Sequence, residues 1–215
     1  MQDVPTLSNT IERFEVRPRN GGFMRPEIRC ILPSLGPMVG NAVTATTISR
    51  TPGSGISECG KSMESFDYIV SVPAPRIVVI DDLDEPPGVG SYWGEIHATQ
   101  HQLAGCVGTA TNGGVRDLPE VERIGFHLFA QNVIVSHAHC HVADFGKPVN
   151  VGEMSVAVGD LLQGDQLGIL KILVENAGEL PSAARKERDR EFELLDRYRT
   201  PGYTYSEFRK ALAKR

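Results

Sequence analysis

One stretch of the chain combines an acid, an arginine–aspartate pair and a second acid at spacings that suit the binding of a small anion. Glu95 is followed by twenty residues and then by Arg116-Asp117, and Glu120 comes after two more residues. An arginine guanidinium donates a planar fork of hydrogen bonds to a carboxylate, and aspartate is an oxygen ligand for Mg²⁺ or Mn²⁺. These residue types predict a site that binds a 2-oxo acid through a guanidinium and a divalent cation.

Glycine-rich turns lead into both parts of this pattern. Gly88, Gly90 and Gly94 precede an expected helix, and the free N–H groups and positive dipole end of a helix start attract a carboxylate or phosphate. A second turn is expected over TNGGVRD, which ends at Asp117. The alternative is structural, because Asp117 followed by Glu120 is also the pattern of a helix N-cap.

A second candidate site is the segment Gly55–Ser62, which matches the GxxxxGK[ST] pattern. In a nucleotide site of this kind, backbone N–H groups cradle phosphates, Lys61 contacts the β/γ oxygens and Ser62 holds Mg²⁺. That site requires a strand running straight into the loop, whereas SRTPGS precedes it here. An acidic partner at Asp81 is only about 20 residues further on, which leaves little room for the usual helix and strand. We therefore favour a glycine-rich surface loop that caps a short helix.

The histidines form two groups. His97 and His101 are four residues apart on an expected helix, which is the spacing of a two-histidine metal pair, but no third ligand is evident. His137, His139 and His141 alternate on an expected strand and would point to one side of it. Either group could be a metal face or a structural one. The structural interpretation is favoured because a metal centre needs ligands that converge from elsewhere.

The elements that position these residues are expected to alternate between helix and strand. Helices are expected over residues 7–14, capped by Thr6 or Ser8, and over 62–69, 92–103 and 118–124; strands are expected over 36–49, 76–80, 106–110, 127–130 and 132–137, with several more between 149 and 173. After Gly178 the charges alternate and apolar residues recur three apart, as in an amphipathic helix, and Thr204 begins a capping box. This predicts an α/β domain over residues 1–177 and a helical C-terminal tail over 178–215.

The composition is that of a globular protein with an acidic balance. The 215 residues include 22 Lys and Arg and 27 Asp and Glu, a net charge of −5. A chain of this length removes roughly 70% of its unfolded surface from water on folding. The acidic balance argues against nucleic acid as a general partner, and no apolar run approaches the ~20 residues that span a bilayer. Four scattered cysteines and the lack of a secretory pattern predict reduced thiols and a cytoplasmic location.

The long-spaced motif resembles the regulator of ribonuclease activity A family, which includes the 4-hydroxy-4-methyl-2-oxoglutarate/4-carboxy-4-hydroxy-2-oxoadipate aldolases. The aldolase members share an acid, twenty residues, Arg-Asp, two residues and an acid, as in Glu95, Arg116-Asp117 and Glu120. Supporting segments are Leu7–Ile11, Val39–Thr44, Lys147–Gly152 and Gly159–Gly168, so the resemblance extends over residues 5–174. The chain departs from the family pattern at Asn9, at Asn112 and in the stretch HAHCH.

The resemblance implies a role for each matching residue. Gly94, Glu95, Ile96 and His97 would line the substrate, largely through backbone N–H groups. Arg116 would bind the carboxylate and oxo oxygen of the substrate, and Asp117 would ligate Mg²⁺ or Mn²⁺. Glu95 and Glu120 would be acids that orient water around the metal.

The resemblance also implies a fold and a function. The fold would be a single swivelling β/β/α-type domain, assembled as a homotrimer or hexamer with its sites between subunits. The function would be that of a divalent-metal-dependent class II aldolase, a lyase that cleaves a 4-hydroxy-2-oxo diacid to pyruvate and a second oxo acid. Decarboxylation of oxaloacetate would be a secondary activity. The alternative within the same family is a non-catalytic regulator that binds and inhibits a ribonuclease.

Overall fold

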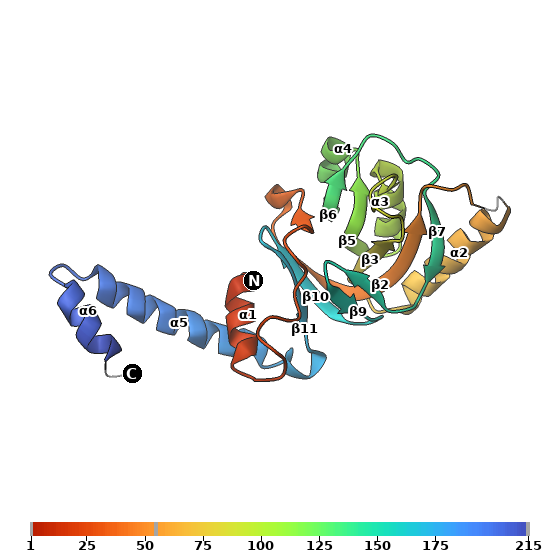
Figure 1. The fold of residues 1–215 in the computed structure, drawn as a ribbon. Coiled ribbons are helices and arrows are strands. Elements are labelled where there is room, and N and C mark those ends of the chain that lie inside the picture. The colour runs from red at the N-terminus through yellow and green to blue at the C-terminus, as the bar shows by residue number, and fades with distance from the viewer. Residues whose placement is uncertain (1, 54–55, 214–215) are drawn as a thin grey trace.

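The computed structural model describes residues 2–53 and 56–213, and of residues 56–62 it describes only the backbone. It shows a mixed α/β fold built around a curved sheet (Figure 1). The strands are β1 (Arg29–Cys30), β2 (Met38–Ile48), β3 (Arg76–Asp82), β4 (Ser91–Trp93), β5 (Cys106–Val115), β6 (His127–Val133), β7 (His141–Phe145), β8 (Val149–Val151), β9 (Met154–Val156), β10 (Leu161–Asp165) and β11 (Gly168–Ile172). The helices are α1 (Val4–Glu12), α2 (Ile56–Ser71), α3 (Glu95–Leu103), α4 (Leu118–Ile124), α5 (Leu180–Arg199) and α6 (Tyr205–Leu212), with short 3₁₀ turns at Pro33–Leu35 and Val174–Asn176.

The centre of the sheet is parallel and its margins are antiparallel. Strands β2, β3, β5 and β6 pair in parallel, in the order β6-β5-β3-β2. The long strand β2 also pairs antiparallel with β10 over residues 38–41 and with β7 over residues 45–48. The short strand β4 pairs in parallel with the end of β5. The carboxyl ends of β4 and β5 therefore meet at one place, where α3 and α4 begin.

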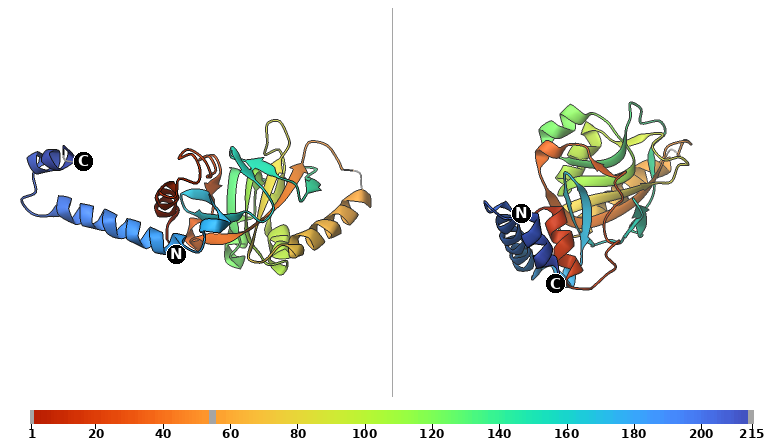
Figure 2. Two further views of the ribbon diagram at one scale, coloured as in Figure 1. Left: turned by 90° about the horizontal axis from the view of Figure 1, so that it is seen from below. Right: turned by 60° about the vertical axis from the view of Figure 1, so that its left-hand side comes forward.

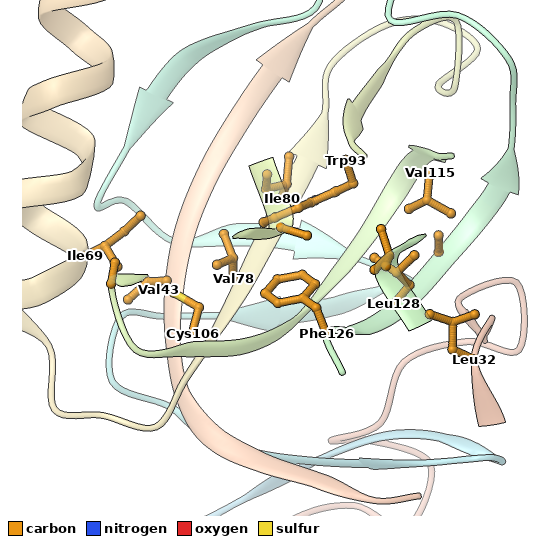
Figure 3. Close-up of a cluster of buried hydrophobic side chains, with 14 of the residues drawn as sticks. Leu32, Val43, Ile69, Val78, Ile80, Trp93, Cys106, Val115, Phe126 and Leu128 are labelled. Atoms are coloured by element: carbon orange, nitrogen blue, oxygen red, sulfur yellow. The ribbon is translucent and has the colours of Figure 1, made fainter. Parts of the chain in front are cut away.

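Each central strand buries side chains on both of its faces. In β3, Val78 and Ile80 belong to one core cluster and Ile77 and Val79 to the other, as the two-residue period of a strand requires. The first cluster is covered by α2, α3 and α4, and Figure 3 shows its strand side chains meeting Ile69 of α2. The second is covered by the β8–β9 hairpin and residues 24–28. A continuous apolar strand that is buried on both faces is typical of a parallel sheet covered on both sides, as the centre of this sheet is.

The C-terminal helices form an arm that leaves the body of the molecule (Figures 1 and 2). The first turns of α5 bury Leu180 and Ala184 against α1 and β11. The guanidinium of Arg188 donates to the Asp3 carboxylate at 2.5 Å. Beyond this point α5 extends outward, and α6 folds back beside its end. The predicted capping box is present at the start of α6. The Thr204 side chain accepts the backbone N–H of Glu207, and the Glu207 carboxylate accepts the backbone N–H of Thr204. Because the start of α5 is part of a buried cluster, the boundary at residues 177 and 178 stays a prediction.

Two predicted helices begin elsewhere than expected. The first helix spans Val4–Glu12 rather than residues 7–14, because its cap is Asp3, whose carboxylate accepts the backbone N–H of Thr6 at 2.9 Å. The segment expected as one helix over 92–103 starts as a strand. Residues 91–93 pair with β5, and the helix begins only at Glu95 after the N-cap Gly94. Sequence periodicity did not reveal this pairing, which is a tertiary contact.

The TNGGV segment, predicted to be a turn, is instead the second half of β5. Gly114 and Val115 pair with β6 as well as with β4. A Cβ on Gly114 would lie 2.4 Å from Cδ1 of Ile134, so this glycine permits close packing between neighbouring strands rather than a reversal of the chain. The strand prediction that ended at residue 110 was therefore too short.

The three alternating histidines do not lie on one strand. Strand β6 ends at Val133 and β7 begins at His141, so His137 and His139 lie in the connecting loop. Between them Ala138 has a φ of 47°, which breaks the two-residue alternation. Of the predicted strand over 132–137 only the first two residues belong to β6, and the shared histidine face was wrong.

The second helix is longer than the predicted segment 62–69, since α2 begins at Ile56. The phosphate-loop candidate Gly55–Ser62 begins outside the described residues, and the side chains of Lys61 and Ser62 are outside them as well. Within the described part of the chain, no helix is long and apolar enough to cross a lipid bilayer.

Candidate active site

Arg116 and Asp117 lie directly after β5, at the point where β4 ends beside it. The backbone N–H of Arg116 donates to the Trp93 carbonyl at 3.1 Å, which extends the β4–β5 pairing by one residue. Nε of Arg116 lies 3.8 Å from Oδ2 of Asp117, and the two side chains are 35% and 38% exposed. The pair is therefore held by the sheet at its backbone while both charged groups remain accessible.

Asp117 occupies the N-cap position of α4 but does not act as a cap. Its backbone is left-handed (φ 55°, ψ 42°), and its side chain accepts no hydrogen bond from its own helix. Instead Oδ2 accepts the backbone N–H of Glu95, the first residue of α3, at 3.2 Å. A non-glycine residue in this conformation carries strain that the surrounding structure must hold in place. The N-cap interpretation was right about the position and wrong about the carboxylate.

Gly94 is the contact point between the two turns. A Cβ at this position would lie 2.4 Å from Oδ2 of Asp117 and 3.3 Å from Nε of Arg116. Any side chain here would push the carboxylate and the guanidinium away from the start of α3. The glycine in this turn is therefore required for close approach, which brings an aspartate, an arginine and a helix N-terminus together.

A pocket of about 230 Å³ opens at this junction. Of the predicted site residues it is lined by Gly94, Ile96, His97, Arg116 and Asp117. Among the described residues that line it, neither Glu95 nor Glu120 is present, although Glu95 contributes its backbone N–H to Asp117. The structure thus brings five of the predicted site residues together around one pocket, while the roles expected for Glu95 and Glu120 stay predictions.

Residues that the motif did not predict complete the pocket: Ser91, Tyr92, His137 and Cys140. The last two come from the β6–β7 loop, which hydrogen bonds hold in place. The backbone N–H of Ser91 donates to the Ser136 carbonyl at 2.9 Å, and that of His139 to the Ser49 carbonyl at 3.1 Å. The HAHCH stretch was the signal that could have identified this wall, although only the fold shows which of its residues face the pocket.

The histidines of α3 have different surroundings. His97 lines the pocket, with its ring stacked on Tyr92 at a centroid distance of 4.3 Å, and its Nδ1 donates to the Tyr92 carbonyl. His101 is only 2% exposed, and its ring lies 4.7 Å from that of Trp93. Burial lowers the pKa of His101 to about 4. The pair therefore does not present two ligands to one metal ion, and His101 is a core residue.

Two pocket groups that are ordinarily protonated at neutral pH have their pKa values raised further by burial. It raises the pKa of the Cys140 thiol to about 11, and it raises the pKa of the Tyr92 hydroxyl well above its usual range. The cysteines whose side chains are described, Cys30, Cys106 and Cys140, are free thiols, as expected. Neither Cys140 nor Tyr92 is therefore a base at neutral pH.

The two residues that depart from the family pattern have structural partners. Asn112 joins the ends of β3 and β5: its amide group donates to the Asp81 carboxylate at 2.8 Å and accepts the backbone N–H of Asp82 at 2.7 Å. Asn9 lies on α1 and donates to Glu191 of α5 at 3.4 Å. Both asparagines are outside the lining of the pocket, so these departures leave the Arg116–Asp117 pair in place.

The residues present fit a magnesium-type ion held by few protein ligands. In the described part of the chain, no three His, Cys, Asp or Glu side chains converge to hold a metal. Mg²⁺ usually keeps several waters and binds through one or two carboxylates together with substrate oxygens. The accessible Asp117 carboxylate beside Arg116 provides one such ligand, next to space that a substrate can occupy.

Comparison with known proteins agrees with this fold. The RraA-like family model, described as aldolase/RraA, matches residues 5–170. An uncharacterized protein of Methanocaldococcus jannaschii is 27% identical over 137 residues, which are 60% of this chain and 62% of that protein. The chain thus matches less than two thirds of the length of that relative.

Solved structures with low sequence identity share the fold. An uncharacterized protein from Pseudomonas syringae pv. tomato superposes with a TM-score of 0.70 at 22% identity, covering 97% of this chain and 89% of that one. Streptomyces coelicolor RraAS2, described as an unusual member of the RNase ES inhibitor RraA protein family, has a TM-score of 0.67 at 18% identity, covering 90% and 92%. The family match over most of its length, together with this shared fold, shows that the chain belongs to the RraA-like family.

Proposed function

We propose that this protein is a metal-dependent aldolase that cleaves a 4-hydroxy-2-oxo diacid to pyruvate and a second oxo acid. One observation carries the proposal: Asp117, in a strained backbone conformation, directs its carboxylate away from its own helix toward the start of α3, beside Arg116 and an open pocket. Family membership alone does not decide the activity, because the family includes aldolases and ribonuclease regulators.

Substrate binding follows from the charges around the pocket. Arg116 binds the carboxylate and the oxo oxygen at C2, since a guanidinium matches two oxygens in a plane. The first-turn N–H groups of α3 at Ile96 and His97 have no intrahelical partner and add the positive end of the helix dipole. Asp117 holds Mg²⁺ or Mn²⁺, which when bound supplies Lewis-acid stabilisation of charge on the substrate oxygens.

Bond cleavage uses the same groups. When the C3–C4 bond breaks, its electron pair enters the pyruvate fragment as an enolate, and the negative charge collects on the oxygen at C2. Arg116 stabilises that charge where it develops. The described residues that line the pocket include no lysine, which disfavours a Schiff-base mechanism. The same enolate results when oxaloacetate loses carbon dioxide, so we propose this decarboxylation as a secondary activity.

The proposal is tested by pyruvate release measured with lactate dehydrogenase, with and without a chelator. Asp117→Asn keeps the shape of the side chain and removes its charge, so we expect kcat/KM to fall by at least about 100-fold. Asp67→Asn, on the exposed face of α2, is the matched control and should retain activity. Release that persists in Asp117→Asn or in the presence of chelator would reject the mechanism.

If the protein is instead a non-catalytic regulator of a ribonuclease, the same experiments give a different result. If the purified protein is inactive on every hydroxy-oxo acid and on oxaloacetate, and instead binds a ribonuclease in a pull-down, the aldolase proposal fails. We propose further that the protein acts in the cytoplasm as a homotrimer or a hexamer.

A further inference from the structure

Cleavage of a 4-hydroxy substrate requires a proton acceptor, for which the sequence motif suggests water held by Glu95. The C4 hydroxyl becomes a carbonyl as the C3–C4 bond breaks, so its proton must move to a nearby base. This question rests on the proposed function. Glu95 and Glu120, the acids expected to manage water and protons here, are not among the described residues that line the pocket.

Most other polar groups of the pocket are unsuited to this task. The Cys140 thiol and the Tyr92 hydroxyl are protonated at neutral pH, because burial raises the pKa of each. The Asp117 carboxylate already accepts the Glu95 N–H and faces Arg116. Among the described residues that line the pocket, the side chains that remain as candidate bases are the imidazoles of His97 and His137.

The contacts of His97 decide which of its ring nitrogens carries the lone pair. Nδ1 contacts the Tyr92 carbonyl, and a carbonyl oxygen can only accept, so Nδ1 carries the hydrogen. In the neutral ring, Nε2 is therefore the unprotonated nitrogen. Parallel stacking on Tyr92, with 8° between the ring planes, also restricts rotation of the imidazole ring. This is the arrangement by which a neighbouring carbonyl sets the reactive nitrogen of a histidine.

The position of His97 on α3 directs it to the charged end of the pocket. It lies three residues after Gly94, so both residues share one face of the helix. Helical side chains lean toward the N-terminus, which here is the end next to Asp117 and Arg116. By contrast, His137 is exposed in a loop, and its Nδ1 contacts only the carbonyl of the adjacent Ala138. His97 is the better positioned imidazole of the two.

We propose that Nε2 of His97 is the catalytic base that accepts the proton of the C4 hydroxyl. The O–H bond breaks as its proton moves to Nε2, the oxygen lone pair forms the new C4 carbonyl, and the C3–C4 bond pair becomes the enolate. The enolate then takes a proton from water at C3 and becomes pyruvate, while the imidazolium returns its proton to water. No oxidant or reductant is involved.

Two substrates separate this role from substrate binding. Cleavage of 4-hydroxy-4-methyl-2-oxoglutarate needs removal of the hydroxyl proton. Decarboxylation of oxaloacetate forms the same enolate without any such proton, because the leaving carboxylate departs as carbon dioxide. Loss of a base therefore affects the first reaction alone, whereas loss of Asp117 affects both.

Two substitutions of His97 separate the basicity of Nε2 from the size and hydrogen bonding of the side chain. His97→Asn keeps an N–H group near the Nδ1 position, facing the Tyr92 carbonyl, and removes Nε2. His97→Gln places an amide near Nε2 that can accept a hydrogen bond but cannot take up the proton. The matched control is His141→Asn, since His141 has the same kind of Nδ1 contact, to the His139 carbonyl at 2.8 Å, outside the pocket lining.

We expect both His97 variants to lose at least about 100-fold in kcat for aldol cleavage, the usual scale of general-base catalysis, and to decarboxylate oxaloacetate within threefold of wild type. The His141 variant should match wild type in both assays. Cleavage within threefold of wild type, equal loss of both activities, or loss that follows His137→Asn instead would overturn the assignment. If the wild-type protein releases pyruvate from neither substrate, the proposed function itself fails, and this assignment with it.

Discussion

Asp117 is a residue at which local preference and tertiary contacts disagree. Its position before α4 favours a cap, yet the carboxylate accepts the N–H of Glu95 from a different helix. The neighbouring turn makes this possible because Gly94 has no side chain at the point of closest approach. The chemistry of the pocket thus depends on an absent Cβ as much as on the charged groups.

The first prediction concerns this contact. Gly94→Ala places a methyl group 2.4 Å from Oδ2 of Asp117, so the carboxylate must move away from α3. A displacement of about 1 Å at a reacting centre costs on the order of 100-fold in rate. We expect kcat/KM for pyruvate release to fall by about that factor while the protein still folds, as judged by circular dichroism.

The matched control for this variant is Gly178→Ala, where no heavy atom lies within 4 Å of the added Cβ. Its activity should equal that of wild type. Wild-type activity in Gly94→Ala would show that the close approach of the two turns is not needed.

At the scale of elements, α3 connects the core to the pocket. One face of this nine-residue helix buries Ala98 and His101, and the adjacent positions place Gly94 and His97 at the pocket. The ring of His101 packs against Phe66, Tyr92 and Trp93. The buried imidazole therefore holds the helix that orients the site.

The second prediction follows from the pKa of His101. The imidazole has a pKa of 6.5 when unfolded and about 4 when folded, so between these values the unfolded chain binds a proton that the folded chain does not. Stability is full above pH 6.5 and falls as the pH drops toward 4, by about 3 kcal/mol from this group.

His101→Phe removes this contribution. Its urea-unfolding free energy should decline by about 2–3 kcal/mol less than that of wild type between pH 7 and pH 4.5. His139→Gln, at an exposed position, should decline in parallel with wild type. A parallel decline in His101→Phe would mean that the buried ring is protonated without penalty.

At the scale of the whole molecule, α5 and α6 form an arm that extends away from the body, so packing against the body does not account for the stability of its outer part. Past Arg188, α5 still contacts α1 through the Asn9–Glu191 hydrogen bond, and its last turns contact α6 through pairs such as Tyr198 with Phe208. Phe192, Leu195 and Tyr198 lie at three-residue spacing and remain partly exposed. Isolated helices are marginal in water, and packing of an apolar face supplies most of their stability.

The third prediction is that this apolar stripe supports the proposed oligomer. Leu195→Glu should shift the mass measured by light scattering toward that of a single chain, because a charge would be buried at the contact. Glu193→Gln, two residues away, should leave the mass unchanged. A wild-type mass equal to one chain would reject the oligomer, and an unchanged mass in Leu195→Glu would exclude the stripe from its contacts.

Sequence alone determined the features that depend on local pattern. The apolar run of β3 predicted a buried strand, the alternating charges of α5 and the Thr204 capping box predicted the two C-terminal helices, and α4 was placed at residues 118–124 as found. The same holds for the Arg116–Asp117 pair, because residue type and spacing suffice to identify a guanidinium next to a carboxylate.

Only the tertiary structure decided what these residues face. The pairing of β4 with β5, the extension of β5 through TNGGV and the loop that brings His137 and Cys140 to the pocket join residues far apart in the chain. The spacing of His97 and His101 is that of a metal pair, yet one ring faces the pocket and the other the core. Side-chain direction depends on which surfaces pack together, and periodicity within one segment does not contain that information.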